Sequence, residues 1–319
     1  MSGNKLPGKG IALKVCIVGC GALGSVIAAH LARLSDLAVY VYDVSEAQMR
    51  AIQQHGLRIS GAAEFTVKVN ATLNPREIPR CDFGIFATKS LDTRAAAQQT
   101  AHVFGEWAPV CSVQNGLGNE EIMAEHIKLV IRGATTLAAH LIAPGHAGLE
   151  FYSTLWIGPF EPSGTPYQQV AQLAEIMNCA GLKVVSLHDA RGAQWTKLIF
   201  NSAVNAVGAL TRLHHGAATR FPPTAALYEA LLEEGETVAK ALGISLHGDP
   251  RKMIAEGASQ PGKRNVSMLQ DVLAKRPTEV DAVNGAIADR GEQLGVPVPL
   301  NRTLWQLIKG IEHAWSDPS

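Results

Sequence analysis

A glycine-rich turn between a short apolar run and a helix-like segment constrains the fold of this chain more than any other feature. The run 15–18 leads directly into Gly19-Cys20-Gly21-Ala22-Leu23-Gly24, which has the spacing Gly-x-Gly-x-x-Gly. In such a turn the first glycine permits a tight bend, the second lets the backbone approach a pyrophosphate, and the third lets the next helix pack closely. The N-terminus of that helix attracts phosphate. We therefore predict a dinucleotide-binding turn formed by Gly19, Gly21, Ala22, Leu23 and Gly24.

An acidic residue follows the second predicted strand, 39–42. Asp43 stands nineteen residues after Gly24, the spacing at which dinucleotide-binding folds place an acid that accepts hydrogen bonds from a ribose 2′-OH. No Arg or Lys occurs between Asp43 and Arg50 to receive a 2′-phosphate. The alternative is that Asp43 only caps the helix-like segment 45–55. The spacing favours the ribose contact.

Composition restricts the classes of partner. The chain has 319 residues, 47% of them hydrophobic, which is enough for one large domain or two ordinary ones. Lys plus Arg and Asp plus Glu both number 28, so no charge excess favours nucleic acid or an anionic membrane. No apolar run reaches the ~18 residues of a membrane-spanning helix. We expect a small-molecule partner.

The cysteines indicate a cellular compartment. Their number, five, is odd, and no Cys-x-x-Cys occurs. This pattern favours a reduced cytoplasmic protein over a disulfide framework or a zinc site, and we expect no metal. Residues 1–12 resemble a signal peptide only superficially, because cleavage would remove the first strand. We interpret them as a disordered extension.

The rest of the chain divides into a strand-containing and a helical part. Strand-like runs occur at 57–59, 65–69, 83–87, 110–113, 147–151, 155–157 and 182–185, and we place 147–157 on the far side of one common sheet. After a boundary near 186–191 helical apolar spacing dominates. The predicted fold is an α/β Rossmann-type doubly wound domain at 13–188, followed by an all-α domain at 189–319.

Two further candidates stand at the carboxyl ends of predicted strands, where doubly wound folds bind their ligands. Lys89 follows the run 83–87. It is a site candidate or a solvated lysine at a helix start, and the sequence does not decide between them. Asn115 follows the run 110–113 within Gln114-Asn115-Gly116. Asn-Gly is also a common turn pair, but the placement favours a contact with cofactor or substrate.

A polar stripe runs along the first long helix of the second half. Lys197, Asn201 and Asn205 are spaced i, i+4 and i+8 in an otherwise apolar segment, so they share one face over about 12 Å. Burying each group without a partner would cost roughly 1–3 kcal/mol. We expect the stripe to line a polar cleft, and the alternative is a satisfied network of hydrogen bonds between helices.

Taken together, these motifs resemble the ketopantoate reductase (2-dehydropantoate 2-reductase) family. The resemblance runs from about residue 14 to residue 312 and is carried by the glycine turn, Lys89, Gln114-Asn115-Gly116, the Lys197 helix, Ser267-Met268-Leu269-Gln270-Asp271 and Thr278-Glu279-Val280-Asp281-Ala282-Val283-Asn284-Gly285. It implies a Rossmann domain, an all-helical domain, an active site in the cleft between them, and NADPH or NADH as cofactor.

The resemblance also implies roles for individual residues. Lys197 is then the general acid that protonates the ketone oxygen, and Glu279 orients this lysine or binds the substrate hydroxyl. Asn201, Asn205 and Ser267 are similar to the residues that bind the substrate, and Asn115 is similar to one that contacts both cofactor and substrate. Without the resemblance, Glu279 after Pro277-Thr278 indicates only an acid at a helix start.

The chain departs from the family pattern at two places. Members that use NADPH usually carry a basic residue where this chain has Asp43, which favours NADH. The usual serine doublet is Val266-Ser267, with Arg264 nearby, and an arginine can bind a carboxylate through two hydrogen bonds.

These observations lead to one principal hypothesis and two alternatives. The principal one is reduction of the 2-oxo acid 2-dehydropantoate to pantoate in pantothenate synthesis. The alternatives are an NAD-dependent 2-hydroxyacid dehydrogenase that acts on another 2-oxo acid, and a non-catalytic dinucleotide-binding regulator. The oligomeric state is left open, with a homodimer as one option.

Overall fold

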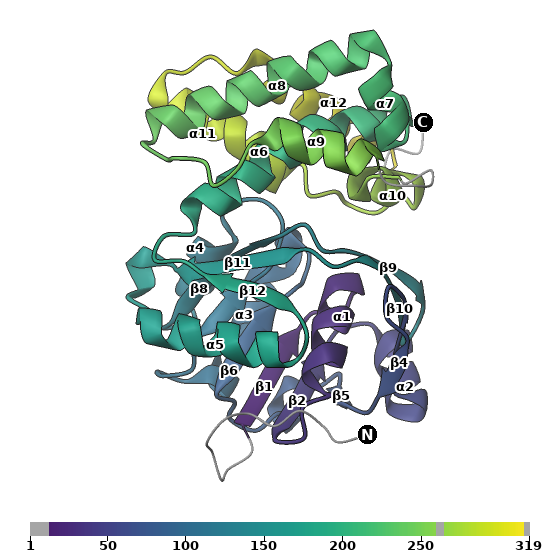
Figure 1. Ribbon diagram of the computed structural model, residues 1–319, viewed down its shortest axis with the longest axis vertical. Coiled ribbons are helices and arrows are strands. Elements are labelled where there is room, and N and C mark those ends of the chain that lie inside the picture. Colours follow the sequence, from purple (N-terminus) through teal and green to yellow (C-terminus); the bar gives the residue numbers. More distant parts are fainter. Residues whose placement is uncertain (1–12, 260–264, 316–319) are drawn as a thin grey trace. The chain divides into compact units, whose positions relative to one another are not determined.

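The computed structural model describes residues 13–259 and 265–315, so the predicted extension at 1–12 and Arg264 lie outside the described residues. The chain forms two compact units, shown in Figure 1. The first comprises the described part of residues 1–114 together with 119–190, and the second comprises 115–118 and the described part of 191–319. The predicted fold class is confirmed: an α/β unit is followed by a helical one.

The first unit is built on an eight-stranded sheet. Its strands are β1 (Leu13–Val18), β2 (Leu37–Tyr42), β5 (Asn70–Thr72), β6 (Phe83–Phe86), β7 (Val110–Ser112), β8 (Val130–Thr135), β11 (Thr154–Pro159) and β12 (Lys183–Ser186), in the order β12-β11-β8-β7-β6-β1-β2-β5. Neighbouring strands are parallel except β8 and β11. The chain passes from β1 to β2 on one side and returns to β6 on the other, so the residues after β1 lie at a topological switch point.

Helices cover both faces of this sheet because the strands are apolar on both sides. In β1, Val15 and Ile17 belong to one hydrophobic cluster and Cys16 and Val18 to another, as the period of two in a strand requires. The first cluster includes α1 (Ala22–Leu31), α2 (Glu46–His55) and α5 (Tyr167–Cys179), and the second includes α3 (Thr93–Phe104) and α4 (Asn119–Ala124). Short 3₁₀ turns are η1 (Pro75–Glu77), η2 (Ser90–Asp92) and η3 (Glu161–Ser163).

A second, four-stranded sheet corrects one sequence prediction. Its strands are β3 (Leu57–Gly61), β4 (Phe65–Val67), β9 (Ala138–Ala143) and β10 (His146–Phe151), in the order β4-β3-β10-β9. The prediction that 147–151 lies in the main sheet is wrong, because β10 pairs in parallel with β3. Gly145, with φ +74°, reverses the chain between β9 and β10, and its carbonyl accepts a hydrogen bond from Arg58 N at 2.8 Å. The run 155–157 does lie in the main sheet, within β11.

The second unit is helical throughout its described residues. It contains α6 (Arg191–Thr211), α7 (His215–Arg220), α8 (Pro222–Ala241), α9 (Pro250–Ser259), α10 (Ser267–Leu273), the π-helical segment η4 (Asp281–Gly285), α11 (Ala286–Leu294) and α12 (Pro299–Ala314). Leu198 and Ile199 of α6 are buried with Leu231 and Leu232 of α8 in its core.

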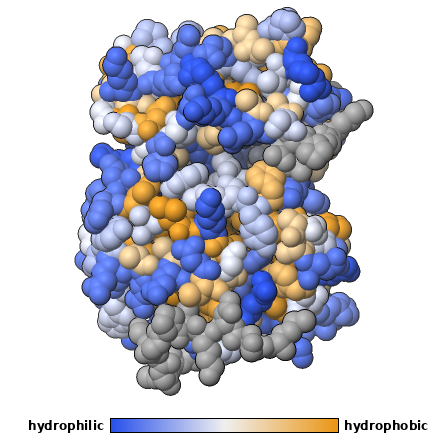
Figure 2. All heavy atoms as spheres, in the orientation of Figure 1, coloured by the Kyte–Doolittle hydropathy of each residue, from blue (hydrophilic) through white to orange (hydrophobic). Residues whose placement is uncertain are grey.

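Hydrophilic side chains lie on the surface of the second unit, outside this core. Figure 2 shows hydrophilic side chains over α8 and α9, where Arg251 forms ion pairs with Glu229 and Glu236. Among the described residues, no helix combines the length and hydropathy that a membrane crossing would need.

Candidate active site

The glycine turn has the geometry that a dinucleotide requires. Gly19 adopts φ +91°, and a Cβ there would lie 2.6 Å from Thr88 N, so this position must be glycine. At Gly24 a Cβ would lie 2.0 Å from the Gly19 carbonyl oxygen, which shows how closely α1 packs on the turn. A Cβ at Gly21, the N-cap of α1, would meet no atom within 4 Å. The turn therefore leaves open space where a pyrophosphate would approach, and a nicotinamide dinucleotide fits these residues.

Asp43 supports this turn directly. Its Oδ2 accepts a hydrogen bond from Cys20 N at 2.7 Å, and its Oδ1 accepts one from Ser45 N at 2.8 Å. The N-cap of α2 is Ser45, whose side chain accepts a hydrogen bond from Gln48 N, so Asp43 is not the capping residue. Each carboxylate oxygen has a second acceptor site, so the ribose contact stays a prediction.

Gln48 is a support of the turn that the sequence motif did not indicate. Its buried side chain donates from Nε2 to the Cys20 carbonyl oxygen at 2.8 Å and accepts at Oε1 a hydrogen bond from Gly145 N at 2.9 Å. The residue thus fastens the turn to the β9–β10 hairpin. Only the partner positions reveal this role, because Gln48 lies in an ordinary amphipathic helix.

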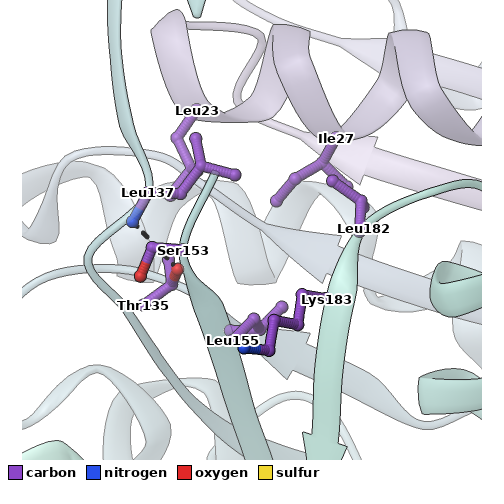
Figure 3. A pocket seen from close by; sticks show the side chains of 8 residues that line it. All are labelled: Leu23, Ile27, Thr135, Leu137, Ser153, Leu155, Leu182 and Lys183. Atoms are coloured by element: carbon purple, nitrogen blue, oxygen red, sulfur yellow. Dashed lines mark hydrogen bonds between the residues drawn. The ribbon is translucent and has the colours of Figure 1, made fainter. Parts of the chain in front are cut away.

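The side chain of Leu23 lines a cavity within the first unit. Figure 3 shows the side chains of Leu23 and Ile27 directed from α1 into a small cavity that is also lined by Leu155 and Leu182. The lining also includes Leu137, Thr135, Ser153 and Lys183, and it contains none of the other predicted site residues. A phosphate contact from Leu23 is thereby limited to its backbone N–H.

The carboxyl ends of β6 and β7 hold one exposed and one buried polar residue. Lys89 is exposed and forms the N-cap of η2, where its carbonyl accepts a hydrogen bond from Asp92 N. Gln114 is buried, and its Nε2 donates to Thr88 Oγ1 at 2.9 Å and to Thr93 Oγ1 at 2.7 Å. Gln114 therefore fixes the loop that packs against Gly19, whereas the role of Lys89 stays a prediction.

Asn115 and Glu279 meet within the second unit. Asn115 Nδ2 donates to Glu279 Oε2 at 3.0 Å. The adjoining segment is held by a hydrogen bond of 2.9 Å from Leu117 N to the Ala282 carbonyl oxygen. A Cβ on Gly116, which has φ +85°, would lie 2.4 Å from that same oxygen. Asn-Gly here serves both as a turn and as the contact that orients a carboxylate, and the sequence did not indicate this pairing.

The predicted polar stripe of α6 lies next to this carboxylate. Asn201 and Asn205 are buried to 8% and 6% exposure, and Ser267 Oγ donates to Asn205 Oδ1 at 3.5 Å. Within residues 13–259 and 265–315, the Asn201 amide and the Lys197 ammonium form no hydrogen bond with another side chain. The roles of Lys197 and Asn201 toward a ligand therefore stay predictions, and the alternative of a network between helices stays open for them.

Burial changes the pKa of Lys197. It lowers the pKa of the ammonium to about 8, and the nearby negative charge of Glu279 opposes this shift. An ammonium with a pKa near the operating pH can both donate a proton and be reprotonated. The site can thus polarise a carbonyl oxygen and deliver a proton to it.

A glycine turn with dinucleotide-binding spacing in one unit and a lysine of lowered pKa in the other indicate the class of protein, an NAD(P)-dependent oxidoreductase. Comparison with known families gives the same answer. Residues 15–162 match the model of ketopantoate reductase PanE/ApbA, and residues 189–312 match the model of its C-terminal domain. The chain belongs to the ketopantoate reductase family.

Individual relatives agree with this assignment. The 2-dehydropantoate 2-reductase of Archaeoglobus fulgidus is 33% identical over 94% of this chain and 98% of its own length. A crystal structure of a PanE/ApbA family ketopantoate reductase from Ralstonia eutropha has 32% identity and a TM-score of 0.85, with 96% of this chain and 100% of that chain covered. A ternary structure of D-mandelate dehydrogenase with NADH and anilino(oxo)acetate has a TM-score of 0.87 at 24% identity, over 96% and 100% of the two chains. That likeness concerns the fold.

Proposed function

We propose that this protein reduces 2-dehydropantoate to pantoate with NADH in the cytoplasm. The observation that carries the proposal is the half-buried Lys197 ammonium, whose pKa desolvation lowers to about 8 near the Glu279 carboxylate. The name of the Archaeoglobus fulgidus relative supports this substrate. Membership in an oxidoreductase family leaves the non-catalytic regulator without support.

The chemistry assigns a distinct task to each polar group of the second unit. A bound nicotinamide dinucleotide supplies the hydride that adds to the carbonyl carbon. Lys197 polarises the carbonyl oxygen and gives it a proton as the alkoxide develops, and water then returns a proton to the amine. Asn201, Asn205 and Ser267 bind the carboxylate and hydroxyl of the substrate through their amide and hydroxyl groups. The negative charge of Glu279 favours the protonated form of Lys197. Asn115 orients the Glu279 carboxylate through a hydrogen bond.

The choice of NADH over NADPH follows from the surroundings of Asp43. A 2′-phosphate would meet the charge of Asp43, and Arg50 forms an ion pair with Glu46 on α2. We expect kcat/KM to be at least roughly tenfold higher with NADH than with NADPH. The double variant D43S/V44R should reverse this order, because Val44 is 79% exposed and an arginine there can meet a phosphate.

The control for this cofactor prediction is Asp43→Asn. An amide retains an oxygen that can accept from Cys20 N, so the turn should survive while the negative charge is lost. Initial rates with both cofactors should show reduced discrimination for this variant. Equal use of NADH and NADPH by the unchanged protein would contradict the assignment.

The proposed acid also predicts a pH dependence. Lys197 must be protonated to donate, and the fraction of protonated lysine falls as the pH rises through about 8. We expect kcat/KM for reduction to be level below this pH and to fall by about tenfold per pH unit above it. The reverse oxidation needs the neutral amine and should increase over the same range. A reduction profile that stays level to about pH 10 would argue against Lys197 as the acid.

The alternative of another 2-oxo acid has its own support. The fold is shared with D-mandelate dehydrogenase, which was solved with NADH and anilino(oxo)acetate. Val266 stands in place of the usual serine and packs against Gly208 of α6. We infer that a bulkier 2-oxo acid is the second candidate substrate. Side-by-side rates with 2-dehydropantoate and phenylglyoxylate, an aromatic 2-oxo acid, test the two candidates. Faster turnover of phenylglyoxylate would replace the first proposal.

A further inference from the structure

A fully buried asparagine connects the helix that carries Lys197 with the segment that carries Glu279. Asn284 Nδ2 donates to the Ser202 carbonyl oxygen of α6 at 3.0 Å and to Asn301 Oδ1 at 3.0 Å. Next to Asn284 in the chain, Val283 N donates to the Glu279 carbonyl oxygen at 3.1 Å. A short path of hydrogen bonds and one peptide unit thus leads from α6 to the backbone of Glu279.

The direction of this network is fixed by a carboxylate. Glu234 of α8 accepts from Asn301 Nδ2 at 2.8 Å and from the N–H groups of Leu300 and Asn301 at 2.8 and 2.9 Å. Because a carboxylate can only accept, Asn301 must present its nitrogen to Glu234 and its oxygen to Asn284. Asn284 must then present its own nitrogen to both partners. Its Oδ1 is buried without a hydrogen bond, so the two donated bonds are the contacts that this amide makes.

The segment around Asn284 is π-helical, and its contacts help to hold the Glu279 carboxylate. Gly285 N donates to the Val280 carbonyl oxygen at 2.9 Å, a π-type bond. The Ala282 carbonyl oxygen accepts from Leu117 N at 2.9 Å. This bond holds the segment from which Asn115 reaches Glu279. Single turns of this type often occur at functional sites.

We propose that Asn284 is a positioning residue that holds Glu279 in register with the Lys197 helix. The role rests on the proposed function of Lys197 and Glu279, and Asn284 itself touches neither substrate nor cofactor. Asn284→Leu keeps the number and branching of the side-chain heavy atoms and removes both donated hydrogen bonds. Glu279 then loses its fixed place relative to α6, while the dinucleotide-binding turn of the first unit is unchanged.

A double-mutant cycle tests this proposal. We expect Asn284→Leu to lower kcat by roughly tenfold or more in the otherwise unchanged enzyme, and by less than about twofold when Glu279→Gln is already present. Dissociation constants for NADH should agree among all variants. Val238→Ala, a buried change in α8, serves as the control for lost stability and should not reproduce the effect on kcat. Equal loss in both backgrounds, or the same loss in the control, would overturn the proposal.

A second measurement needs neither substrate nor turnover. Acetylation of the Lys197 amine, followed by mass spectrometry over a range of pH, reports its protonation. We expect the midpoint, about 8 in the unchanged protein, to fall in Asn284→Leu and Glu279→Gln alike and to fall no further when both are combined. An unchanged or raised midpoint in Asn284→Leu would overturn the proposal. If Asn284→Leu does not fold, Asn284→Ser, which keeps one donor, should show the same shift in smaller degree.

The two measurements also separate this inference from the proposed function. If the unchanged protein reduces no 2-oxo acid, the proposed function fails, but acetylation still shows whether Asn284 controls the pairing of Glu279 with Lys197. If the protein is an active reductase and the cycle is additive, only the positioning role fails.

Discussion

Replacement of Lys197 by methionine is expected to lower kcat for 2-oxo acid reduction by about 10²–10⁴-fold, the usual contribution of a positioned general acid. Methionine has nearly the same length and no charge, so α6 should keep its packing. The pKa of about 8 that burial gives this ammonium is the physical basis of the prediction. Stopped-flow measurement of NADH oxidation under single-turnover conditions reports the chemical step directly.

A matched variant separates chemistry from folding. Lys240→Met removes a lysine from the exposed end of α8 and should leave the rate unchanged. NADH binding to the Lys197→Met protein, measured by quenching of protein fluorescence, should be nearly normal, because the cofactor turn belongs to the other unit. Full activity in Lys197→Met would remove the proposed mechanism.

Two glycine substitutions are both expected to weaken dinucleotide binding, but only one of them is expected to lower stability. Gly21→Ala should weaken dinucleotide binding by roughly tenfold or more without loss of stability. Gly21 has φ −69° and ψ −158°, which alanine adopts, and its Cβ would enter open space where the pyrophosphate approaches. Gly24→Ala would place a Cβ 2.0 Å from the Gly19 carbonyl oxygen, so it should weaken binding and lower the free energy of unfolding by about 1–3 kcal/mol.

Calorimetry and thermal unfolding of the two variants check these expectations. Gly21→Ala should keep Tm within about 2 °C of the unchanged protein, whereas Gly24→Ala should lower it clearly. If Gly21→Ala binds NADH normally, the open space beside Gly21 is not the pyrophosphate site.

The predictable features of this chain are those that depend on residues close together in sequence. The glycine turn and the acid after β2 could be predicted from spacing, because each position has a fixed local task in a βαβ unit. The stripe on α6 could be predicted from helical periodicity alone. The role of Glu279 depended on the family resemblance, since an acid after Pro277-Thr278 also suits a plain helix start.

What the sequence did not indicate are pairings between distant segments. The bond from Asn115 to Glu279 joins residues 164 positions apart, and no periodicity predicts it. The same holds for Gln48 behind the glycine turn and for β10, which pairs with β3 rather than with the main sheet. Such contacts depend on which surfaces meet in the folded chain, and tertiary packing selects them over local preference.

Oxidation of NADH in the presence of 2-dehydropantoate, followed at 340 nm with the purified protein and repeated with NADPH and with phenylglyoxylate, shows whether the protein is the proposed reductase. We expect fast turnover of 2-dehydropantoate with NADH, slower turnover with NADPH, and loss of both in Lys197→Met. Tight NADH binding without reduction of any 2-oxo acid would show that the protein is not a 2-oxo acid reductase.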